Sequence, residues 1–463
     1  MQQDWGIIFA FGLYFLALFG IGIFHMKKEQ DLAGYVLGGR KVGPWVSAMS
    51  AEASDMSGWM LMGLPGYAYV AGVSAFWIAI GLAIGTWLNW LFVAKRLRVY
   101  TKIANDSITL PDFFENRFRD KTKILRVVSA IFIFIFFLIY TASGFVAGGR
   151  LFNTVFGLPY FESLLITAGI VVFYYTFTGG YVAVCRTDFF QGCLMFFAII
   201  IVPVTGIFKA GGPVTAFEKL YNMNANYFSF FTDATGVTLS ATAIISLLAW
   251  GLGYFGQPHI LVRFMGISSA KEIPQATRIA MVWVIFSLFF AVTVGLVGRV
   301  LLGDTLTGVN AETVFMVLNN EFFVSFLAGI IISAILGAIM STSSSQLLVT
   351  ASAISTDFYQ ALLRKNAGEK ELVFVSRLSV ILVEHMPGQA SAPLLARLYC
   401  SAFSGAALLS KALLQAFSSV AAQCLSGKNF LLTPVFTKSF PVSSFQLWLF
   451  MLSACWIKNP MLL

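Results

Sequence analysis

Long charge-free stretches recur along the chain, and each has the length of a membrane-spanning helix. An α-helix needs roughly 20 apolar residues to cross the roughly 30 Å hydrocarbon core of a bilayer. The uninterrupted runs are residues 5–24, 73–94, 127–149, 163–185, 189–208, 237–258, 279–298 and 322–356. A further stretch, residues 44–72, is apolar overall but contains charged and helix-breaking residues. The pattern therefore predicts nine spans before residue 357, with a tenth beginning near Leu378.

The composition supports this interpretation and excludes several classes of protein. Of the 463 residues, 58% are hydrophobic and 11% are charged, and the mean hydropathy is +0.82. Soluble proteins carry about 25% charged residues, so the chain is predicted to be an all-α polytopic membrane protein. We find no Walker loop, catalytic Ser-His-Asp set or metal-ligand spacing in the sequence. We therefore expect neither an enzyme nor an ATP-driven pump.

The positive charge follows the predicted membrane topology. With the N-terminus outside, the inside segments contain 21 Lys and Arg residues, whereas the outside connections contain only four. Those inside segments are residues 27–44, 93–126, 179–188, 259–278 and 357–377. This asymmetry is typical of the positive-inside rule and predicts an N-terminus outside the cell. The net charge of +9 is thus explained by the membrane, and we expect no nucleic-acid partner.

Two predicted spans are interrupted by helix-breaking residues at comparable positions. The first interruption is AEASDMSGW at residues 51–59, and the second is WGLGYFGQP at residues 250–258. Paired interrupted helices are typical of transporters built from inverted repeats, whose binding site lies near the middle of the membrane. The first repeat is predicted to cover residues 44–208. The second is predicted to begin near residue 237 and to end near residue 400.

The composition changes abruptly near the end of the predicted second repeat. No acidic residue occurs from 385 to 463, although the preceding 384 residues contain 21. We therefore divide the chain into a transporter core, residues 1–383, and an aberrant tail, residues 384–463. The tail has the character of a shifted reading frame, which would leave the second repeat incomplete. An unusual but genuine set of C-terminal helices is the alternative.

Asp55 is the first candidate for a functional residue, because it is an ionisable side chain at membrane depth. Such residues are costly and usually bind an ion, pair with another group or line a water-filled path. Ser54, Ser57 and Gly58 favour helices poorly, so a break there would free backbone carbonyls to bind a cation. The alternative is a structural carboxylate that a neighbouring Arg or a backbone amide satisfies.

A dense hydroxyl cluster, STSSS at residues 341–345, is the second candidate. Ser341 and Thr342 follow Ala338 by three and four residues, which places their oxygens near the Ala338 carbonyl on one helical turn. Facing the first interruption, they would complete an all-oxygen cage for a hard cation such as Na⁺. The alternative is that these hydroxyls only pack the helix or bend it.

Aromatic residues near the second interruption are the third candidate. Trp250, Tyr254 and Pro258 have the spacing of one α-helical face, and the glycines between them permit close approach of a small ligand. Tyr140, late in a long apolar run, is a further candidate. The alternatives are ordinary packing for the first group and an interfacial aromatic belt for Tyr140.

The motifs that surround these candidates are together distinctive. They are YVLGGRKVGPWVSAMSAEASDMSGWMLMGLPG, TLPDFFENRF, LIYTASGFVAGGRLF, WGLGYFGQPHILVRF and AGIIISAILGAIMSTSSSQLLV. Between about residues 6 and 383 the chain closely resembles the bacterial sodium/proline symporters of the solute:sodium symporter family. The resemblance implies a LeuT-like five-plus-five inverted repeat and Na⁺-coupled proline uptake across the bacterial inner membrane. It implies no obligate protein partner. The tail after about residue 384 does not share it.

The resemblance also assigns roles to individual residues. It implies that Na⁺ is held by the carbonyls of Ala53, Met56 and Ala338 and the hydroxyls of Ser341 and Thr342, with Asp55, Ser57 and Gly58 nearby. It implies that proline contacts Tyr140, Trp250, Tyr254 and Pro258, with Trp59, Ser57 and Gly329 close by. Arg40 and Asp188 match positions linked to coupling and gating, and both lie at predicted cytoplasmic ends of spans.

Three alternatives to active proline transport remain open at this point. The altered tail would fit a truncated or frameshifted product without transport activity. A family member could instead carry a different small solute, or use H⁺ in place of Na⁺. Glu52 departs from the pattern, because relatives carry a small residue there. It would either add a second negative charge to the ion site or face an aqueous path.

Overall fold

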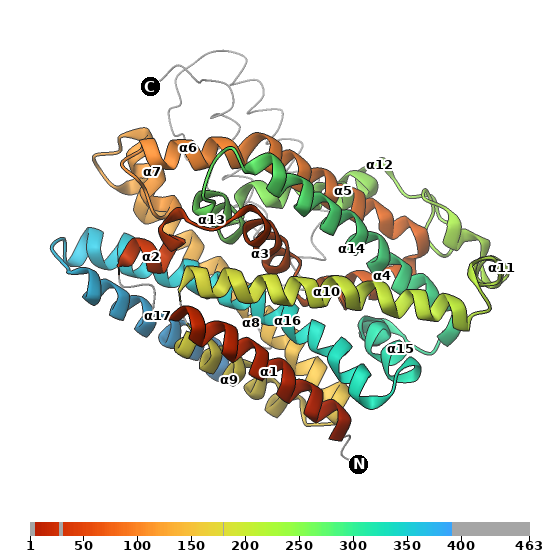
Figure 1. Cartoon of the computed structure of the whole chain (residues 1–463). Helices are drawn as coiled ribbons and strands as arrows, with labels where there is room; N and C mark the ends of the chain where they lie inside the picture. The colour runs from red at the N-terminus through yellow and green to blue at the C-terminus, as the bar shows by residue number, and fades with distance from the viewer. Residues whose placement is uncertain (1–4, 27–30, 179, 391–463) are drawn as a thin grey trace.

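The computed structural model describes residues 5–26, 31–178 and 180–390, which form an elongated bundle of helices (Figure 1). Within those ranges the only β structure consists of two isolated bridges. Up to residue 156 the elements are α1 (Trp5–Met26), α2 (Leu32–Leu37), η1 (Gly38–Arg40), α3 (Pro44–Met56), η2 (Gly58–Met60), α4 (Gly63–Ala71), η3 (Gly72–Ala75), α5 (Phe76–Leu88), η4 (Asn89–Ala94), α6 (Lys95–Ile103), α7 (Leu110–Phe118) and α8 (Ile124–Phe156).

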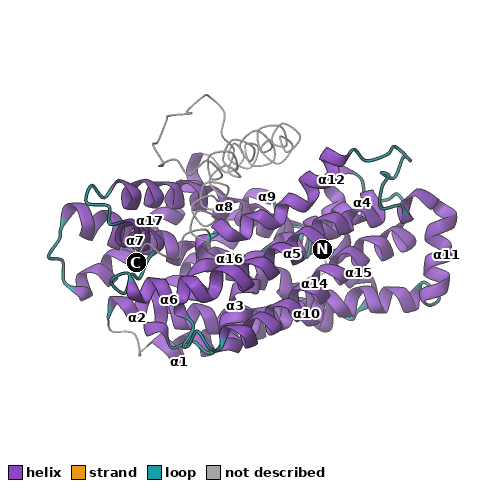
Figure 2. Cartoon of the chain, turned by 90° about the horizontal axis from the view of Figure 1, so that it is seen from above, coloured by secondary structure: helices purple, strands orange, loops and turns teal. Residues whose placement is uncertain are grey.

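The remaining elements continue the bundle through the second interruption. They are α9 (Tyr160–Thr178), α10 (Tyr181–Lys209), α11 (Pro213–Met223), η5 (Ala225–Phe228), α12 (Ala241–Leu248), η6 (Ala249–Gly256), α13 (Pro258–Gly266), α14 (Ile273–Leu302), η7 (Gly308–Thr313), α15 (Val314–Phe322), α16 (Ser325–Ser352), η8 (Ala353–Leu363) and α17 (Glu369–Ala390). Seen from above, the long helices run along a common direction (Figure 2).

Both predicted interruptions are confirmed. Helix α3 ends at Met56, where Ser57 has a left-handed φ of 48°, and the chain resumes as a short 3₁₀ turn. The second interruption is the 3₁₀ helix η6, which the extended residue Gln257 separates from the start of α13 at Pro258. Proline is well suited to the first turn of a helix because its missing N–H has no partner there.

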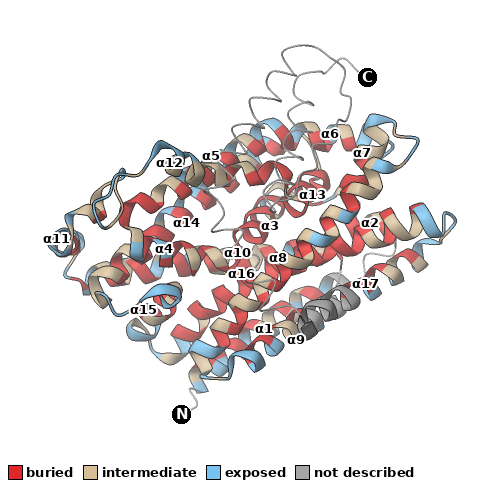
Figure 3. Cartoon of the chain, turned by 180° about the vertical axis from the view of Figure 1, so that it is seen from behind, coloured by how far each residue is buried: buried red, intermediate tan, exposed pale blue. Residues whose placement is uncertain are grey.

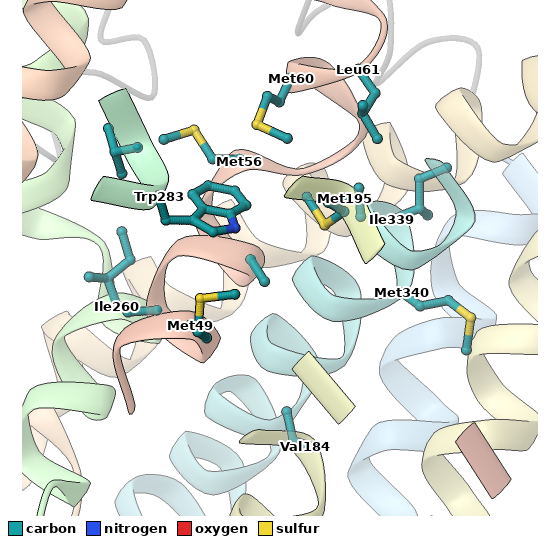
Figure 4. Close-up of a cluster of buried hydrophobic side chains, with 14 of the residues drawn as sticks. Met49, Met56, Met60, Leu61, Val184, Met195, Ile260, Trp283, Ile339 and Met340 are labelled. Carbon is teal, nitrogen blue, oxygen red and sulfur yellow. The ribbon is translucent and has the colours of Figure 1, made fainter. Parts of the chain in front are cut away.

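Helices α3 and α16 occupy the centre of the bundle. Helix α16 packs against α1, α8, α10 and α3, and nearly all of its residues after Ala328 are buried (Figure 3). Helix α3 packs in turn against α10, α13, α14 and α16. Methionines such as Met49, Met56 and Met60 line this contact (Figure 4), and their flexible side chains fill the irregular space around the break.

Six helical segments are long and apolar enough to cross a membrane, among the residues that the structure describes. The interrupted spans do not all reach that length because their halves are separate elements. The predicted boundary between the runs 163–185 and 189–208 is wrong. Helix α10 starts at Tyr181, so Asp188 lies inside a continuous helix rather than in a connection.

The basic connections gather at one end of the bundle. Helices α2 and α7 lie at the end opposite α11 and α15 (Figure 1). Arg40, which has a left-handed φ of 55°, holds this end together. Its guanidinium donates to the Asp106 carboxylate at 3.0 Å and to the Met265 carbonyl at 2.9 Å, so it joins the ends of α6 and α13. This grouping fits the charge asymmetry of the sequence.

The aberrant tail predicted for residues 384–463 lies mostly outside the described residues. The described chain continues as helix α17 to Ala390. The proposed division of the core into repeats at residues 44–208 and from about 237 stays a prediction.

Helix α5 and η6 approach so closely that only glycine fits between them. A Cβ atom at Gly85 would lie 2.1 Å from the Gly251 carbonyl oxygen. We expect Gly85→Ala to cost about 1–3 kcal/mol or more of stability, because the backbones must separate. The midpoint of thermal unfolding of the purified protein in detergent measures this loss. Gly12→Ala in α1 is the matched control, because its Cβ meets nothing within 4 Å. Equal midpoints for both variants would contradict the proposed tight contact.

Candidate functional site

The end of α3 presents backbone oxygens to the centre of the bundle. The last four carbonyls of an α-helix have no helical partner, and in α3 these belong to residues 53–56. Ser57 cannot continue the helix, because its left-handed φ directs the chain away. A non-glycine residue in that conformation stores on the order of 1–2 kcal/mol of strain, as is common at functional sites.

Ser341 of α16 meets these oxygens directly. Its hydroxyl lies 2.7 Å from the Ala53 carbonyl oxygen and 3.1 Å from the Ala338 carbonyl oxygen. Three oxygens from two helices therefore converge at the break. Gly58 permits this approach, since a Cβ there would lie 3.1 Å from the Ile339 side chain. Met56, which supplies a further carbonyl in the predicted cage, is buried beside them.

Thr342 adds an unsatisfied group to the same turn of α16. Its hydroxyl oxygen is buried and has no hydrogen-bond partner among the described residues. An unpaired buried hydroxyl is costly, so it indicates a missing partner. Hydroxyl and carbonyl oxygens are the ligands that hard cations prefer. The donor set at Ala53, Ala338, Ser341 and Thr342 therefore fits a bound Na⁺.

The predicted aromatic residues lie on the other side of the break. Trp59 and Trp250 stack with ring centroids 5.1 Å apart, and the Tyr254 hydroxyl lies 3.9 Å from the Met56 sulfur. The prediction that Trp250, Tyr254 and Pro258 share one α-helical face is wrong. Residues 249–256 form a 3₁₀ helix with three residues per turn, so side chains four apart point in different directions.

Tyr140 of α8 approaches the break from a third direction. Its hydroxyl lies 3.5 Å from the Asp55 carbonyl oxygen, at the limit of a hydrogen bond. His259 lies beside it, with ring centroids 6.4 Å apart, and follows Pro258 at the start of α13. His259 is fully buried, and neither ring nitrogen has a hydrogen-bond partner among the described residues. Its place directly after the second interruption was the only sequence signal for this residue.

Gly329 is not brought together with the other predicted residues. It lies near the start of α16 and contacts α1, where a Cβ would be 2.7 Å from the Ala10 side chain. Nine residues separate it from Ala338, which corresponds to about 13 Å along a helix. Ser57, in contrast, lies at the break itself, where its hydroxyl accepts a hydrogen bond from the Trp59 amide at 3.2 Å.

Asp55 and Glu52 occupy one side of α3. Both are buried, and no basic side chain of the described chain forms an ion pair with either. Asp55 interacts with the Tyr254 side chain. Glu52 accepts a hydrogen bond from the Trp90 indole at 2.9 Å and is only 3% exposed, so it does not face an aqueous path in this structure.

Asp188 forms a buried ion pair that the sequence did not indicate. Its carboxylate lies 3.1 Å from the Arg263 guanidinium and 2.6 Å from the Ser50 hydroxyl, and Arg263 also bonds Ser345. Asp188 and Arg263 have no exposed surface. The prediction that Asp188 is an interfacial charge is therefore wrong. The pair connects α3, α10, α13 and α16 one turn of α16 beyond the oxygen cage.

Arg40 lies at the end of the bundle, as predicted. Burial lowers the pKa of its guanidinium below the ordinary value, and the nearby Asp106 carboxylate partly offsets this effect. Arg40 also donates to the Thr101 hydroxyl and the Ser107 carbonyl. These contacts join η1 to α6, to the loop that follows it and to α13.

Comparison with known proteins shows which family of proteins the chain belongs to. The family model described as "Sodium:solute symporter family" matches residues 35–431, a range that includes part of the tail. The chain belongs to this family, whose members couple solute transport to sodium, and it is a multi-pass secondary transporter rather than an enzyme.

The curated relatives to which the chain is similar are named as proline transporters. The High-affinity proline transporter PutP of Bacillus subtilis (strain 168) is 50% identical over 364 residues, which cover 78% of this chain and 76% of the relative. The Osmoregulated proline transporter OpuE of the same strain is 46% identical over 378 residues, covering 81% and 76%. Sodium/proline symporter 2 of Staphylococcus saprophyticus is 46% identical over 388 residues, covering 83% and 75%.

Solved structures support the LeuT-like fold. A Na⁺-coupled sialic acid symporter in its substrate-bound outward-open state matches with a TM-score of 0.71 and 19% identity, covering 88% of this chain and 84% of that one. MhsT in complex with L-phenylalanine matches with a TM-score of 0.52 and 13% identity, covering 89% and 96%. At these identities the likeness concerns the fold alone.

The Asp188–Arg263 pair generates a prediction about stability. Arg263→Gln leaves a buried carboxylate without its cation, which typically costs about 3–5 kcal/mol. The double variant with Asp188→Asn removes both charges, so we expect it to unfold at a higher temperature than Arg263→Gln alone. Thermal unfolding of Arg263→Gln, of Asp188→Asn and of the double variant in detergent measures the interaction energy between the two side chains. Strictly additive losses would contradict a direct pair.

Proposed function

We propose that this chain takes up L-proline together with Na⁺ across the bacterial cytoplasmic (inner) membrane by alternating access. The observation that carries this proposal is the convergence of the Ala53 carbonyl, the Ala338 carbonyl and the Ser341 hydroxyl beside the unpartnered Thr342 hydroxyl. The names of three relatives at 46–50% identity support proline as the solute. We propose that the end with the basic connections lies in the cytoplasm and that the N-terminus lies outside, because basic residues favour the cytoplasmic side.

Na⁺ is proposed to bind where α3 and α16 meet. Its ligands are the carbonyls of Ala53, Met56 and Ala338 and the hydroxyls of Ser341 and Thr342, with the Asp55 carboxylate nearby. The ion would replace the Ser341 hydrogen bonds as the link between the two helices. It would also supply the missing partner of Thr342. Binding therefore stabilises the interrupted end of α3 in one arrangement.

Proline is proposed to bind among the aromatic residues beside the break. Trp59, Trp250 and Tyr254 provide apolar and polarisable surface for the pyrrolidine ring, and Tyr140 and Pro258 complete the site. The free carbonyls at the end of α3 accept hydrogen bonds from the imino group, whereas Ser57 contributes its hydroxyl. Gly329 lies against α1 and is left out of this site.

Coupling follows from the shared use of the α3 break. Because Na⁺ orders the segment that carries Ser57 and Trp59, it raises the affinity for proline, and proline raises the affinity for Na⁺ by the same factor. Arg40 and the Asp188–Arg263 pair are proposed to hold the cytoplasmic half closed while both ligands bind. No protein partner is required by this scheme.

A chain without transport activity is the second candidate, and the composition of residues 384–463 favours it. Proline uptake into vesicles, driven by a Na⁺ gradient and compared with choline replacement, decides between the two. We expect uptake that disappears when Na⁺ is removed. Uptake equal in choline, or driven by a pH gradient alone, would exclude Na⁺ coupling, and competition by sugars would indicate another solute.

Thr342→Ala tests the ion site. Loss of a hydroxyl ligand to a cation costs about 1.5–3 kcal/mol, so the Na⁺ concentration for half-maximal uptake should rise about 10-fold or more. Ser333→Ala is the matched control, because its buried hydroxyl bonds the Gly329 carbonyl of its own helix at 2.8 Å. An unchanged Na⁺ requirement in Thr342→Ala would remove this assignment.

Trp250→Ala tests the solute site. Removing the ring that stacks on Trp59 should raise the proline concentration for half-maximal uptake by about 10-fold, because buried tryptophans often dominate binding. Trp87→Ala is the control, since that side chain is 48% exposed on α5. If both variants bind proline as the unchanged protein does, the solute does not contact Trp250.

A further inference from the structure

A small cavity lies beyond the oxygen cage, toward the end of the bundle with the basic connections. Its volume is about 10 Å³, enough for one water molecule or one ion of similar size. Residues of α2, α7, α8, α13, α16 and η8 line it. Most of the lining is apolar, and Thr109, Ser352 and Asp357 are its polar residues.

Asp357, which lines this cavity, carries an unsatisfied carboxylate oxygen. The side chain has no exposed surface. Its Oδ1 accepts hydrogen bonds from Arg126 at 2.7 Å and from the Thr109 hydroxyl at 3.0 Å. Its Oδ2 has no partner among the described residues. A buried carboxylate oxygen without a donor or a cation is expensive, so it indicates a ligand.

The local charge balance points to a cation. The Arg126 guanidinium lies within 4 Å of three carboxylates, with separations of 2.7 Å to Asp357, 3.1 Å to Glu115 and 3.3 Å to Asp112. All three carboxylates are at most 18% exposed. Lys123, the other nearby base, donates to the Ala361 carbonyl. Even with the charge of Lys123, two basic side chains do not neutralise three carboxylates, so the cluster attracts a further positive charge.

The backbone around Asp357 is also unusual. Residues 353–363 form the π-helix η8, which extends α16. Short π-helical segments are rare and occur frequently at functional sites. Val349 lines the cavity and follows Thr342 by seven residues, so it lies on the same face of α16 about 10 Å further along. Val262, which also lines the cavity, precedes Arg263 of the buried ion pair.

We propose that the cavity at Asp357 is a second site for a monovalent hard cation, occupied by Na⁺ on its way from the oxygen cage to the cytoplasm. The identity of the ion and the direction of its movement rest on the proposed function. Asp357 Oδ2 is the proposed charged ligand, and Ser352 and Thr109 line the same cavity. The ion compensates the excess negative charge around Arg126.

Equilibrium binding of ²²Na⁺ to the purified full-length protein in lipid nanodiscs tests this proposal without proline or transport. We expect two Na⁺ ions per chain at saturation. In Asp357→Asn, which preserves the size of the side chain, the half-saturation concentration of one component should rise at least 10-fold while the other is unchanged. In Thr342→Ala the other component should weaken.

Two further variants make the result interpretable. Glu115→Gln is the matched control, because it removes the same charge from Arg126 but does not line the cavity. We expect it to weaken the same component clearly less than Asp357→Asn does, because it lowers the attracting charge but keeps the ligand, and to leave the other component unchanged. Ser352→Val fills the cavity without touching an ion pair, and should abolish the same component as Asp357→Asn. Ser352→Val therefore still tests the cavity site if Asp357→Asn fails to fold.

The possible outcomes separate this site from the principal one. One Na⁺ per chain, unaffected by Asp357→Asn and by Ser352→Val, would mean that the cavity holds only water and would overturn the proposal. Equal losses in Glu115→Gln and Asp357→Asn would also overturn it, because the effect would come from loosening the Arg126 cluster. A loss in Asp357→Asn with no change in Thr342→Ala would support this site while contradicting the proposed principal ion site.

Discussion

The hydrogen bond from Ser341 to the Ala53 carbonyl joins the two central helices at the point where one of them stops. This contact is possible because α3 ends at Met56 and leaves its last carbonyls without helical partners. The left-handed Ser57 turns the chain away, and Gly58 lets α16 approach. The oxygen cage, the aromatic residues beside it and the two-helix link proposed for Na⁺ all depend on this break.

The buried acidic side chains Asp188, Glu52 and Asp357 each have specific partners inside the bundle. Asp188 pairs with Arg263. Glu52 meets only the Trp90 indole, and Asp357 shares Arg126 with two other carboxylates. The first pair matches one cation to one carboxylate, which suits its proposed role in holding the cytoplasmic half closed. Among the residues that the structure describes, only the cluster around Asp357 brings several carboxylates to one guanidinium.

The sequence indicated the two segments that meet at the candidate site, because helix breaking and hydroxyl content are local properties of each segment. That Ser341 contacts the Ala53 carbonyl is a tertiary relation between them. The common face for Trp250, Tyr254 and Pro258 was wrong, since the contact between Gly85 and Gly251 accompanies a 3₁₀ helix. Gly329 carried no local signal for the neighbour it meets, which is α1.

Hydropathy and helix propensity determined the bundle of membrane helices and its two interruptions, and the motifs around them indicated the family, because each depends on residues close together in sequence. Tertiary structure alone decided that Arg263 neutralises Asp188, that Trp90 satisfies Glu52 and that Asp357 lines a cavity. These relations depend on the distance and register between helices far apart in the chain. Neither quantity is encoded in the pattern of any single segment.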